Sequence, residues 1–250
     1  MRILKRTFIT IGQYFLLMRR VFVMPDKPRV FLAQTFIEME KLGMSSVMIV
    51  AVISFFMGAV ITIQTALNFF NPLLPKFYIG LIARDSILLE FSSTMIALIL
   101  AGKVGSNITS EIGSMRISEQ IDAMEIMGLN SANYLILPKV VASVVFNPFL
   151  TILSMFIGIL GGAFIVTVTQ IIMFADYIHG VQAYLIPFYV TYGIVKMIVF
   201  SLIITTIPAF YGYNVRGGSL DVGKSGTVSI VVSCVLILLF NLILTQLMLT

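Results

Sequence analysis

The sequence predicts an all-α integral membrane protein with five transmembrane helices, because it is strongly apolar and its charges fall between long apolar stretches. Of its 250 residues, 59% are hydrophobic and only 11% are charged, whereas a soluble domain carries about a quarter charged residues. The mean hydropathy is +1.05. Several uncharged stretches reach the roughly 20 residues that cross a bilayer. We therefore expect a single membrane domain over 1–250, with no soluble domain attached.

The first 43 residues predict helices at the membrane surface rather than a span. At helical spacing, the apolar and polar side chains of 1–24 fall on different sides: Leu4, Phe8, Ile11, Phe15 and Phe22 on one, and Arg2, Arg6, Gln13 and Arg20 on another. This pattern is typical of an interfacial helix with its basic side toward the headgroups. Arg19 interrupts the apolar run and no small-residue cleavage site follows, which argues against a signal peptide. A second short helix is expected from Pro28 to Leu42, ended by Gly43.

Five spans are expected after this region, at 44–67, 83–103, 140–172, 187–211 and 225–249. In the second, only twelve residues separate Glu90 from Lys103, so a span of about 20 residues places Glu90 inside the bilayer. The prolines and aromatic residues of 68–78 favour an interfacial turn. Gly158 and Gly162 form a small-xxx-small pair, which favours close contact between the third span and another helix.

The distribution of basic residues predicts the orientation. Thirteen of the 16 Lys and Arg residues lie in 1–43, 103–139 and 212–224. Because cytoplasmic loops carry an excess of Lys and Arg, we expect these segments and the N-terminus in the cytoplasm. The net charge of +5 follows the membrane edges and forms no soluble basic patch, so no nucleic-acid partner is expected.

The polar stretch 103–128, between the second and third spans, predicts a cytoplasmic coupling helix over 109–128 that ends at Gly128. Its apolar face carries Ile117, Ile121 and Met124, and its charged residues sum to −3: Glu111, Arg116, Glu119, Asp122 and Glu125. A bare cytoplasmic loop near anionic lipid would more naturally be basic, and a solvated loop would leave the apolar face without a partner. We therefore favour a helix that docks in a cleft of an ATPase.

The sequence EIGSMRISEQIDAMEIMG at 111–128, preceded by AGKVGSNITS at 101–110, resembles the signature of the MlaE/YrbE-type permeases. These are the membrane subunits of lipid-transporting ABC systems that work with Mce proteins. The similarity covers nearly the whole chain, including DVGKSGTVSIVVS at 221–233. It implies a single permease domain, a homodimer, two copies of a cytoplasmic ABC ATPase, and a periplasmic MCE-domain protein that exchanges phospholipid at the outer face. ATP would be bound by the ATPase, so no cofactor is expected on this chain.

Two ionisable residues, Glu90 and Lys196, lie inside apolar spans, which is costly unless they are paired or face water. We expect them to face the same interior space. They form either a helix-to-helix salt bridge or a polar patch in a lipid cavity, where Lys196 meets a phosphate and Glu90 balances it. The family carries an acid and a lysine at matching places and a glutamine near the lipid pocket. The lipid-binding prediction is therefore Gln64, Glu90, Phe91 and Lys196.

The chain departs from the family pattern at two places near these residues. Ser92-Ser93 stands where the family has Gly-Pro, which puts the local helix bend in doubt. Asn241 stands where some relatives have an acid, which argues against a charge relay that reaches the last helix.

Other motifs carry less. The segment 218–225 satisfies the phosphate-loop pattern, but it joins two apolar spans instead of a strand and a soluble helix, so we expect a turn that caps the fifth span. His179 is expected at the interface and Cys234 in a buried apolar setting. We predict no catalytic residues and no metal site, since no cluster has metal-ligand spacing.

These observations predict a membrane permease subunit, not an enzyme, in a bacterial inner membrane. ATP-driven closure of the partner would push on 109–128 and reshape a cavity lined by the first, second and fourth spans. Two alternatives stay open. One is an ion-coupled secondary carrier of an amphipathic substrate that uses Glu90 and Lys196, and the other is a non-transporting membrane scaffold.

Overall fold

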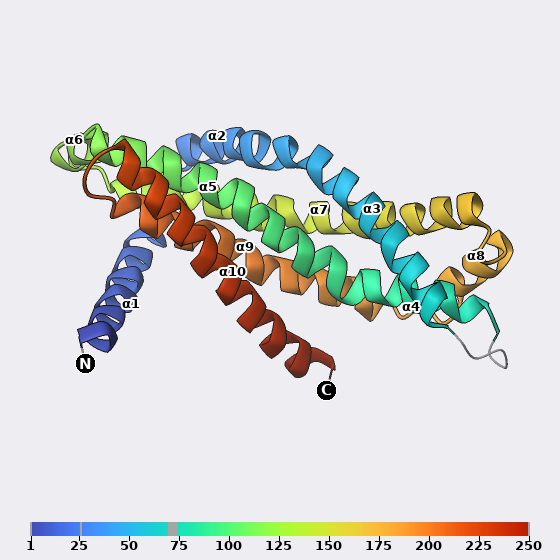
Figure 1. Ribbon diagram of the computed structural model, residues 1–250. Coiled ribbons are helices and arrows are strands. Elements are labelled where there is room, and N and C mark those ends of the chain that lie inside the picture. The colour runs from blue at the N-terminus through green and yellow to red at the C-terminus, as the bar shows by residue number, and fades with distance from the viewer. Residues whose placement is uncertain (1, 26, 70–74, 250) are drawn as a thin grey trace.

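The computed structural model describes residues 2–25, 27–69 and 75–249, with the side chains of 2–7 left out. The regular structure in these residues is entirely helical, and Figure 1 shows its elongated arrangement. The α-helices, and two π-helical segments named η, are α1 (Arg2–Val21), α2 (Pro28–Glu38), η1 (Met39–Met44), α3 (Ser45–Asn68), α4 (Phe77–Ser86), η2 (Ile87–Met95), α5 (Ile96–Ile117), α6 (Gln120–Ile126), α7 (Ser131–Thr169), α8 (Phe174–Gln182), α9 (Phe188–Tyr213) and α10 (Ser219–Leu249).

Five continuous helical segments in the described residues are long and apolar enough to cross a membrane: Pro28–Asn68, Phe77–Ile117, Ser131–Thr169, Phe188–Tyr213 and Ser219–Leu249. The predicted fold class, an all-α membrane protein with five spans, is confirmed. Several helices extend beyond the expected bounds because polar residues near their ends find partners. For example, α7 begins at Ser131, where the side chain of Asn130 accepts a hydrogen bond from the backbone N–H of Asn133.

The first two spans are each one helix interrupted by a π-helical segment. The prediction that Gly43 ends the second surface helix is wrong, because α2, η1 and α3 run on without a break. Gly43 instead lets α7 approach, since a Cβ at this position would overlap the ring of Phe146. Likewise α4, η2 and α5 are continuous. The turn expected at 68–78 includes residues 70–74, which lie outside the described set.

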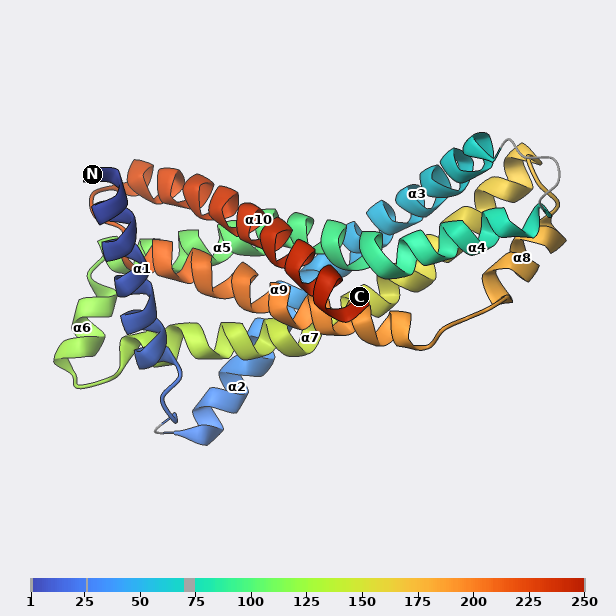
Figure 2. The same ribbon diagram turned by 90° about the horizontal axis from the view of Figure 1, so that it is seen from below.

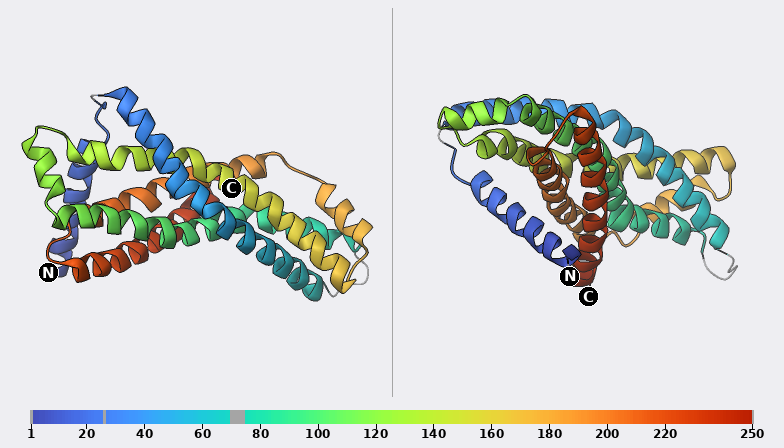
Figure 3. Two further views of the ribbon diagram at one scale, coloured as in Figure 1. Left: turned by 90° about the horizontal axis from the view of Figure 1, so that it is seen from above. Right: turned by 60° about the vertical axis from the view of Figure 1, so that its left-hand side comes forward.

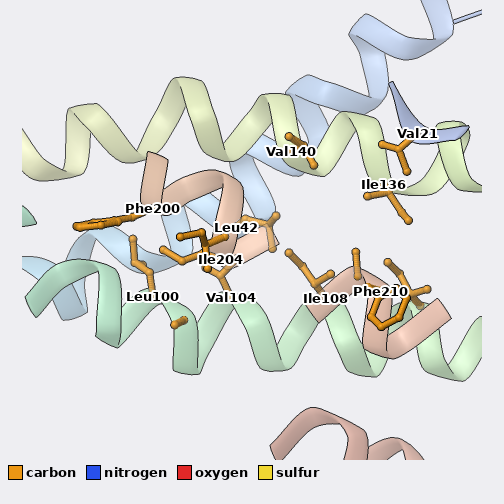
Figure 4. Packing of buried hydrophobic residues seen from close by; sticks show 14 of the residues in the cluster. Val21, Leu42, Leu100, Val104, Ile108, Ile136, Val140, Phe200, Ile204 and Phe210 are labelled. Atoms are coloured by element: carbon orange, nitrogen blue, oxygen red, sulfur yellow. The ribbon is translucent and has the colours of Figure 1, made fainter. Parts of the chain in front are cut away.

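The largest hydrophobic core lies where α5, α7 and α9 meet (Figure 4). Leu100, Val104 and Ile108 repeat at i, i+4 and i+8 along α5, so they form one stripe on that helix. The stripe faces Phe200 and Ile204 of α9, and all five side chains are buried. This core joins α5 and α9 through buried side chains along much of their length.

Glycines set the close approach of α3 and α7, which cross in Figure 3. A Cβ on Gly58 would overlap the carbonyl oxygen of Gly158, and one on Gly161 would overlap that of Phe55. Gly162 leaves room for the hydroxyl of Tyr177. The predicted role of Gly158 and Gly162 in close helix contact is confirmed.

Helix α1 lies crosswise over one end of the bundle, near α6, while α8 and the start of α4 lie at the opposite end (Figures 1 and 2). Leu17, Met18 and Val21 anchor α1 to the core. Phe8 and Phe15 of α1, and Phe22 directly after it, are 72%, 65% and 57% exposed. Because these three share one face, α1 has the two-sided character expected of a surface helix.

Candidate functional site

The two intramembrane ionisable residues form an ion pair. Lys196 of α9 places its Nζ 2.9 Å from Oε1 of Glu90 in η2, so the prediction that they face the same interior space is confirmed. Lys196 also donates to the hydroxyl of Tyr192, one turn earlier on α9, at 2.9 Å. The ammonium lies 4.6 Å from the centre of that tyrosine ring. These contacts satisfy the lysine charge inside an apolar bundle.

Helix α10 completes this polar cluster, which we define as Glu90, Thr94, Tyr192, Lys196, Asn241 and Thr245. Asn241 donates to Glu90 Oε2 at 3.1 Å, and Thr245 donates to Glu90 Oε1 at 3.2 Å. Thr94 of η2 donates to the side-chain Oδ1 of Asn241 at 3.0 Å. The network therefore reaches the last helix through neutral hydrogen bonds and not through a second charge, which agrees with the absence of an acid at 241.

Sequence reasoning did not select Thr94, Tyr192 or Thr245, although a signal was present. Thr94 follows Glu90 by four residues, Tyr192 precedes Lys196 by four, and Thr245 follows Asn241 by four. Residues four apart share a helix face. Polar residues one turn away from an intramembrane charge are therefore the natural candidates for its partners.

The segment that carries Glu90 departs from α-helical geometry even without the family's Gly-Pro. Residues Ile87–Met95 are π-helical, and Ser92 and Ser93 are both buried there. The Oγ of Ser93 donates to the carbonyl of Glu90, and Lys196 reaches the carbonyl of Leu89 at 3.5 Å. Side-chain donors thus bond to backbone carbonyls in a stretch where the usual i to i+4 hydrogen-bond pattern of the helix is interrupted. Such π-helical segments are frequent at functional sites.

The two charges differ in access. Lys196 is fully buried, whereas the side chain of Glu90 is 39% exposed. In this arrangement Lys196 is enclosed by its neighbours, and its contact with a lipid phosphate stays a prediction. The carboxylate of Glu90, by contrast, faces open space at a depth where contact with hydrocarbon would be costly.

A pocket of about 370 Å³ lies next to this segment, between α3, α4 and η2. Gln64 and Phe91, two of the predicted lipid-binding residues, both line it, and Thr65, Asn68 and Ser86 add polar groups. Glu90 and Lys196 are not among its lining residues. The four predicted residues therefore divide between an open pocket and the adjacent polar cluster.

The stretch 109–128 is not one helix. Its first part continues α5 to Ile117, Glu119 takes a left-handed conformation with φ of 61°, and α6 begins at Gln120. The reversal buries Ile121 completely and brings Arg116 Nη1 within 2.6 Å of Asp122 Oδ1. A straight helix would carry Ile121 into solvent, so the apolar face predicted for a partner is instead covered by the chain's own core.

The end of α6 confirms the stop expected at Gly128. Gly128 has φ of 80°, a conformation that glycine adopts without strain. Its N–H donates to the carbonyl of Glu125 and that of Leu129 to Met124, the two hydrogen bonds of a Schellman motif. Just before this stop, Ile126 and Met127 are 88% and 68% exposed. The exposed apolar surface at this turn is therefore its tip and not the predicted stripe.

The five residues predicted to contact an ATPase separate into two groups. Glu111 belongs to an internal ion cluster, since its Oε2 lies 2.8 Å from Lys41 and 2.9 Å from Lys139. Lys139 is 4% exposed and also contacts Glu38 at 2.6 Å. This cluster fastens α5 to η1, α2 and α7. Arg116, Glu119, Asp122 and Glu125 lie at the α5–α6 turn itself.

Glu125 is tied to the end of α9. The hydroxyl of Tyr213 donates to its Oε1 at 2.8 Å and that of Ser131 at 3.1 Å. The Tyr213 hydrogen bond, followed by the weaker effects of Ser131 and the nearby Arg20 and Arg116, lowers the pKa of the Glu125 carboxyl. A pKa that is lower in the folded state stabilises that state at every pH above the ordinary pKa of the carboxyl. These contacts are therefore intact at neutral pH, and their contribution is lost only as the pH falls through the lowered pKa of Glu125.

The phosphate-loop pattern at 218–225 has its anion position filled by the chain. Gly218 donates its backbone N–H to Asp221 Oδ2 at 3.2 Å, and Lys224 lies 3.5 Å from Asp221 Oδ1. Because α10 already begins at Ser219, most of the motif is helical, and the chain turns only in the residues just before it. Within the described residues, no group of three or more His, Cys, Asp or Glu side chains is placed to hold a metal.

Comparison with known proteins agrees with this architecture. The model of the family described as "Permease MlaE" matches residues 35–247. The chain belongs to the MlaE permease family. A probable ABC transporter permease of Rickettsia bellii is 34% identical over 82% of this chain and 79% of its own length. A probable ABC transporter permease of Synechocystis sp. is 32% identical over 94% of this chain and 89% of its own length. The intermembrane phospholipid transport system permease protein MlaE of Haemophilus influenzae is 28% identical over 84% of this chain and 81% of its own length.

As a member of the MlaE permease family, the chain is a permease subunit of a transporter and a multi-pass membrane protein. It is not an enzyme itself. The matched range contains both the polar cluster and the α5–α6 turn. These two places are therefore the candidate sites for the substrate and for coupling.

Proposed function

We propose that this chain is the membrane subunit of an ABC-type transporter that moves phospholipid across or out of a bacterial inner membrane. Family membership supports the permease role, and the name of the Haemophilus influenzae relative, an intermembrane phospholipid transport system permease protein, supports the substrate class. The N-terminus and the α5–α6 turn are cytoplasmic in this proposal, because the basic residues concentrate at that end.

The observation that carries the proposal is the half-exposed charge of Glu90 beside the pocket of Gln64 and Phe91. A carboxylate 39% exposed in the middle of an apolar span needs a polar neighbour or water. A phospholipid supplies both an amphipathic body for the pocket and a charged headgroup for the cluster. The headgroup phosphate reaches Lys196 only when α10 moves aside, because Asn241 and Thr245 now close the cluster on that side.

A separate ATPase drives that movement in our proposal, and ATP binds there and not on this chain. It docks on the α5–α6 turn through the exposed Glu119 and the apolar tip at Ile126 and Met127. Rigid-body motion of α5 then moves η2, since the two are one continuous helix, and this motion separates η2 from α10. Two copies of the chain and two ATPases make the transporter, and a periplasmic MCE-domain protein receives or delivers the lipid at the α8 end.

The test is affinity purification of the chain from its native membranes in mild detergent, followed by mass spectrometry of bound proteins and lipids. We expect an ABC ATPase and phospholipid with the wild-type chain. The variant Gln64→Leu with Phe91→Ala should retain the ATPase but lose most of the lipid. The matched control, Lys224→Gln, removes a charge 78% exposed at the other end and should change neither.

Three results would count against the proposal. Recovery of neither ATPase nor phospholipid would overturn it. Transport driven by a proton or sodium gradient without an ATPase would favour an ion-coupled carrier that uses Glu90 and Lys196. Unchanged lipid handling in Glu90→Ala and Lys196→Ala would favour a scaffold without transport.

A further inference from the structure

A second concave surface lies at the α6 end, between α1 and the ends of the bundle helices. This α1 pocket has a volume of about 530 Å³, and its polar lining is Gln13, Arg19, Arg20, Asn130, Tyr213 and Asn214. It is separate from the polar cluster and from the pocket of Gln64. Two arginines and four neutral polar side chains give it a positive character suited to an anionic group.

The backbone of Arg20 is held in place, but the two arginines of this pocket are not neutralised. Asn130 donates its side-chain amide to the backbone carbonyl of Arg20 at 2.9 Å, which fixes the end of α1 against the start of α7. Among the described residues, neither guanidinium makes an ion pair or a side-chain hydrogen bond, and both arginines are exposed. Arg20 lies near enough to Glu125 to act on its carboxyl, although Tyr213 is the closer partner. The pocket thus keeps unpaired positive charge on a rigid wall.

The faces of α1 indicate which way this pocket opens. Phe8, Phe15 and Phe22 form its exposed apolar face, which is the face that a bilayer would cover. Gln13 lies nine residues from Phe22 and Arg20 five residues from Phe15, which is about 180° and about 140° around a helix. Gln13 and Arg20 therefore lie on the side of α1 away from the apolar face, whereas Arg19, four residues after Phe15, lies about 40° from that face at the border of the pocket. A headgroup of the surrounding bilayer would have to pass around the helix to reach Arg20.

The pocket is also continuous with the turn proposed to dock the ATPase. Tyr213 lines the pocket and its hydroxyl holds Glu125 of α6 at 2.8 Å. Its ring also lies under Arg116, whose guanidinium carbon is 5.9 Å from the ring centre. Figure 2 shows α1 and α6 at the same end of the molecule. A protein seated on α6 would therefore meet the pocket at the same time.

We infer that the α1 pocket is a second docking point for the ATPase and receives an acidic segment of it. The inference rests on the proposed function, because it adds to the contact surface of the same partner. The proposed ATPase contact surface then carries both negative and positive charge, in an acidic turn with Glu119 and a basic pocket with Arg19 and Arg20. Paired carboxylates on the ATPase would be bound by two planar guanidinium groups, a geometry that fixes orientation as well as affinity.

The experiment uses the full chain in nanodiscs and, as the probe, the ABC ATPase recovered with the wild-type chain. Affinity is measured at low and high salt for three variants: Arg19→Glu with Arg20→Glu, the milder Arg19→Gln with Arg20→Gln, and Lys27→Glu with Arg29→Glu as the control. The control reverses two exposed charges of the same region outside the α1 pocket. Elution volume and circular dichroism verify the fold of each variant.

We expect the double reversal at 19 and 20 to weaken ATPase binding about tenfold or more, with a smaller loss for the glutamine pair and little change for the control. The difference from wild type should shrink at high salt. Equal affinity for the reversed and control variants would overturn the inference, and so would loss of co-purified anionic lipid without loss of ATPase affinity. If Glu119→Lys still weakens binding in that case, the proposed function stands; if the wild-type chain binds no ATPase, both fail.

Discussion

Lys196 and Glu90 lie 106 positions apart in the sequence, yet their charged atoms are 2.9 Å apart inside the bundle. The pair is asymmetric, since Lys196 is 0% and Glu90 39% exposed. A charge that keeps access to solvent can be rehydrated when its partner is removed, whereas an enclosed charge cannot. This asymmetry determines how the two single substitutions should differ.

Glu90→Gln should therefore destabilise the chain more than Lys196→Met. Glu90→Gln leaves the Lys196 ammonium without a counter-charge in a closed site, at a cost of about 3 kcal/mol. Lys196→Met leaves a carboxylate to which Asn241 and water can still donate hydrogen bonds. The double variant should cost less than the sum of the two. Thermal unfolding in one detergent measures all three, with Lys224→Gln as the exposed control. Equal costs for the two single variants would contradict the described access.

The pocket beside η2 predicts a contrast between neighbouring positions of α3. Gln64 lines the pocket, while Thr62 is 2% exposed and faces α7. In a Cys234→Ser background, Gln64→Cys should react with a polar thiol reagent and Thr62→Cys should not. In the proposed orientation, a membrane-impermeant reagent should label position 64 from the periplasmic side only. Labelling of both positions, or of neither, would contradict an open pocket at this depth.

The partners of a charged residue could be predicted from the sequence inside the membrane spans but not at the membrane edge. Glu90 and Lys196 could be paired from the sequence because an apolar span leaves an ionisable group few alternatives. Glu111 could not be assigned in the same way, since it lies in a polar stretch on the side that carries most of the basic residues, where Lys41 and Lys139 were only two of many possible partners. A helical wheel orders residues around an axis but does not show which face meets the rest of the protein.

The backbone irregularities were equally hidden. The π-helical segment at Ile87–Met95 has no glycine or proline, and its register shift leaves no mark in composition. Glu119 takes a left-handed conformation that usually indicates glycine or asparagine. Its cause is tertiary, because the turn buries Ile121 and pairs Arg116 with Asp122. Hydropathy, by contrast, located all five candidate spans.

Glu111 and Glu119 should respond differently to the same substitution. Glu111→Lys places a third cation beside Lys41 and Lys139 and should cost about 2 kcal/mol or more of stability, because Lys139 is enclosed. Glu119→Lys changes an exposed residue, so stability should shift by less than about 0.5 kcal/mol while ATPase binding weakens. Thermal unfolding and ATPase co-purification on the same preparations separate the two effects. A stable Glu111→Lys protein that has lost only the ATPase would restore Glu111 to the docking surface.

The close contact between α3 and α7 can be tested by comparing two helix glycines, one with crowded surroundings and one with open surroundings. A Cβ at Gly58 would overlap the backbone of Gly158, whereas one at Gly102 meets nothing within 4 Å. Gly58→Ala should therefore destabilise the chain by about 1–3 kcal/mol, and Gly102→Ala should stabilise it by about 0.5–1 kcal/mol because alanine favours a helix interior. Since α3 also carries Gln64, displacement of α3 by Gly58→Ala should reduce the phospholipid that co-purifies. Unfolding temperatures and lipid mass spectrometry test both effects, and a Gly58→Ala protein as stable as Gly102→Ala would show that the two helices do not approach this closely.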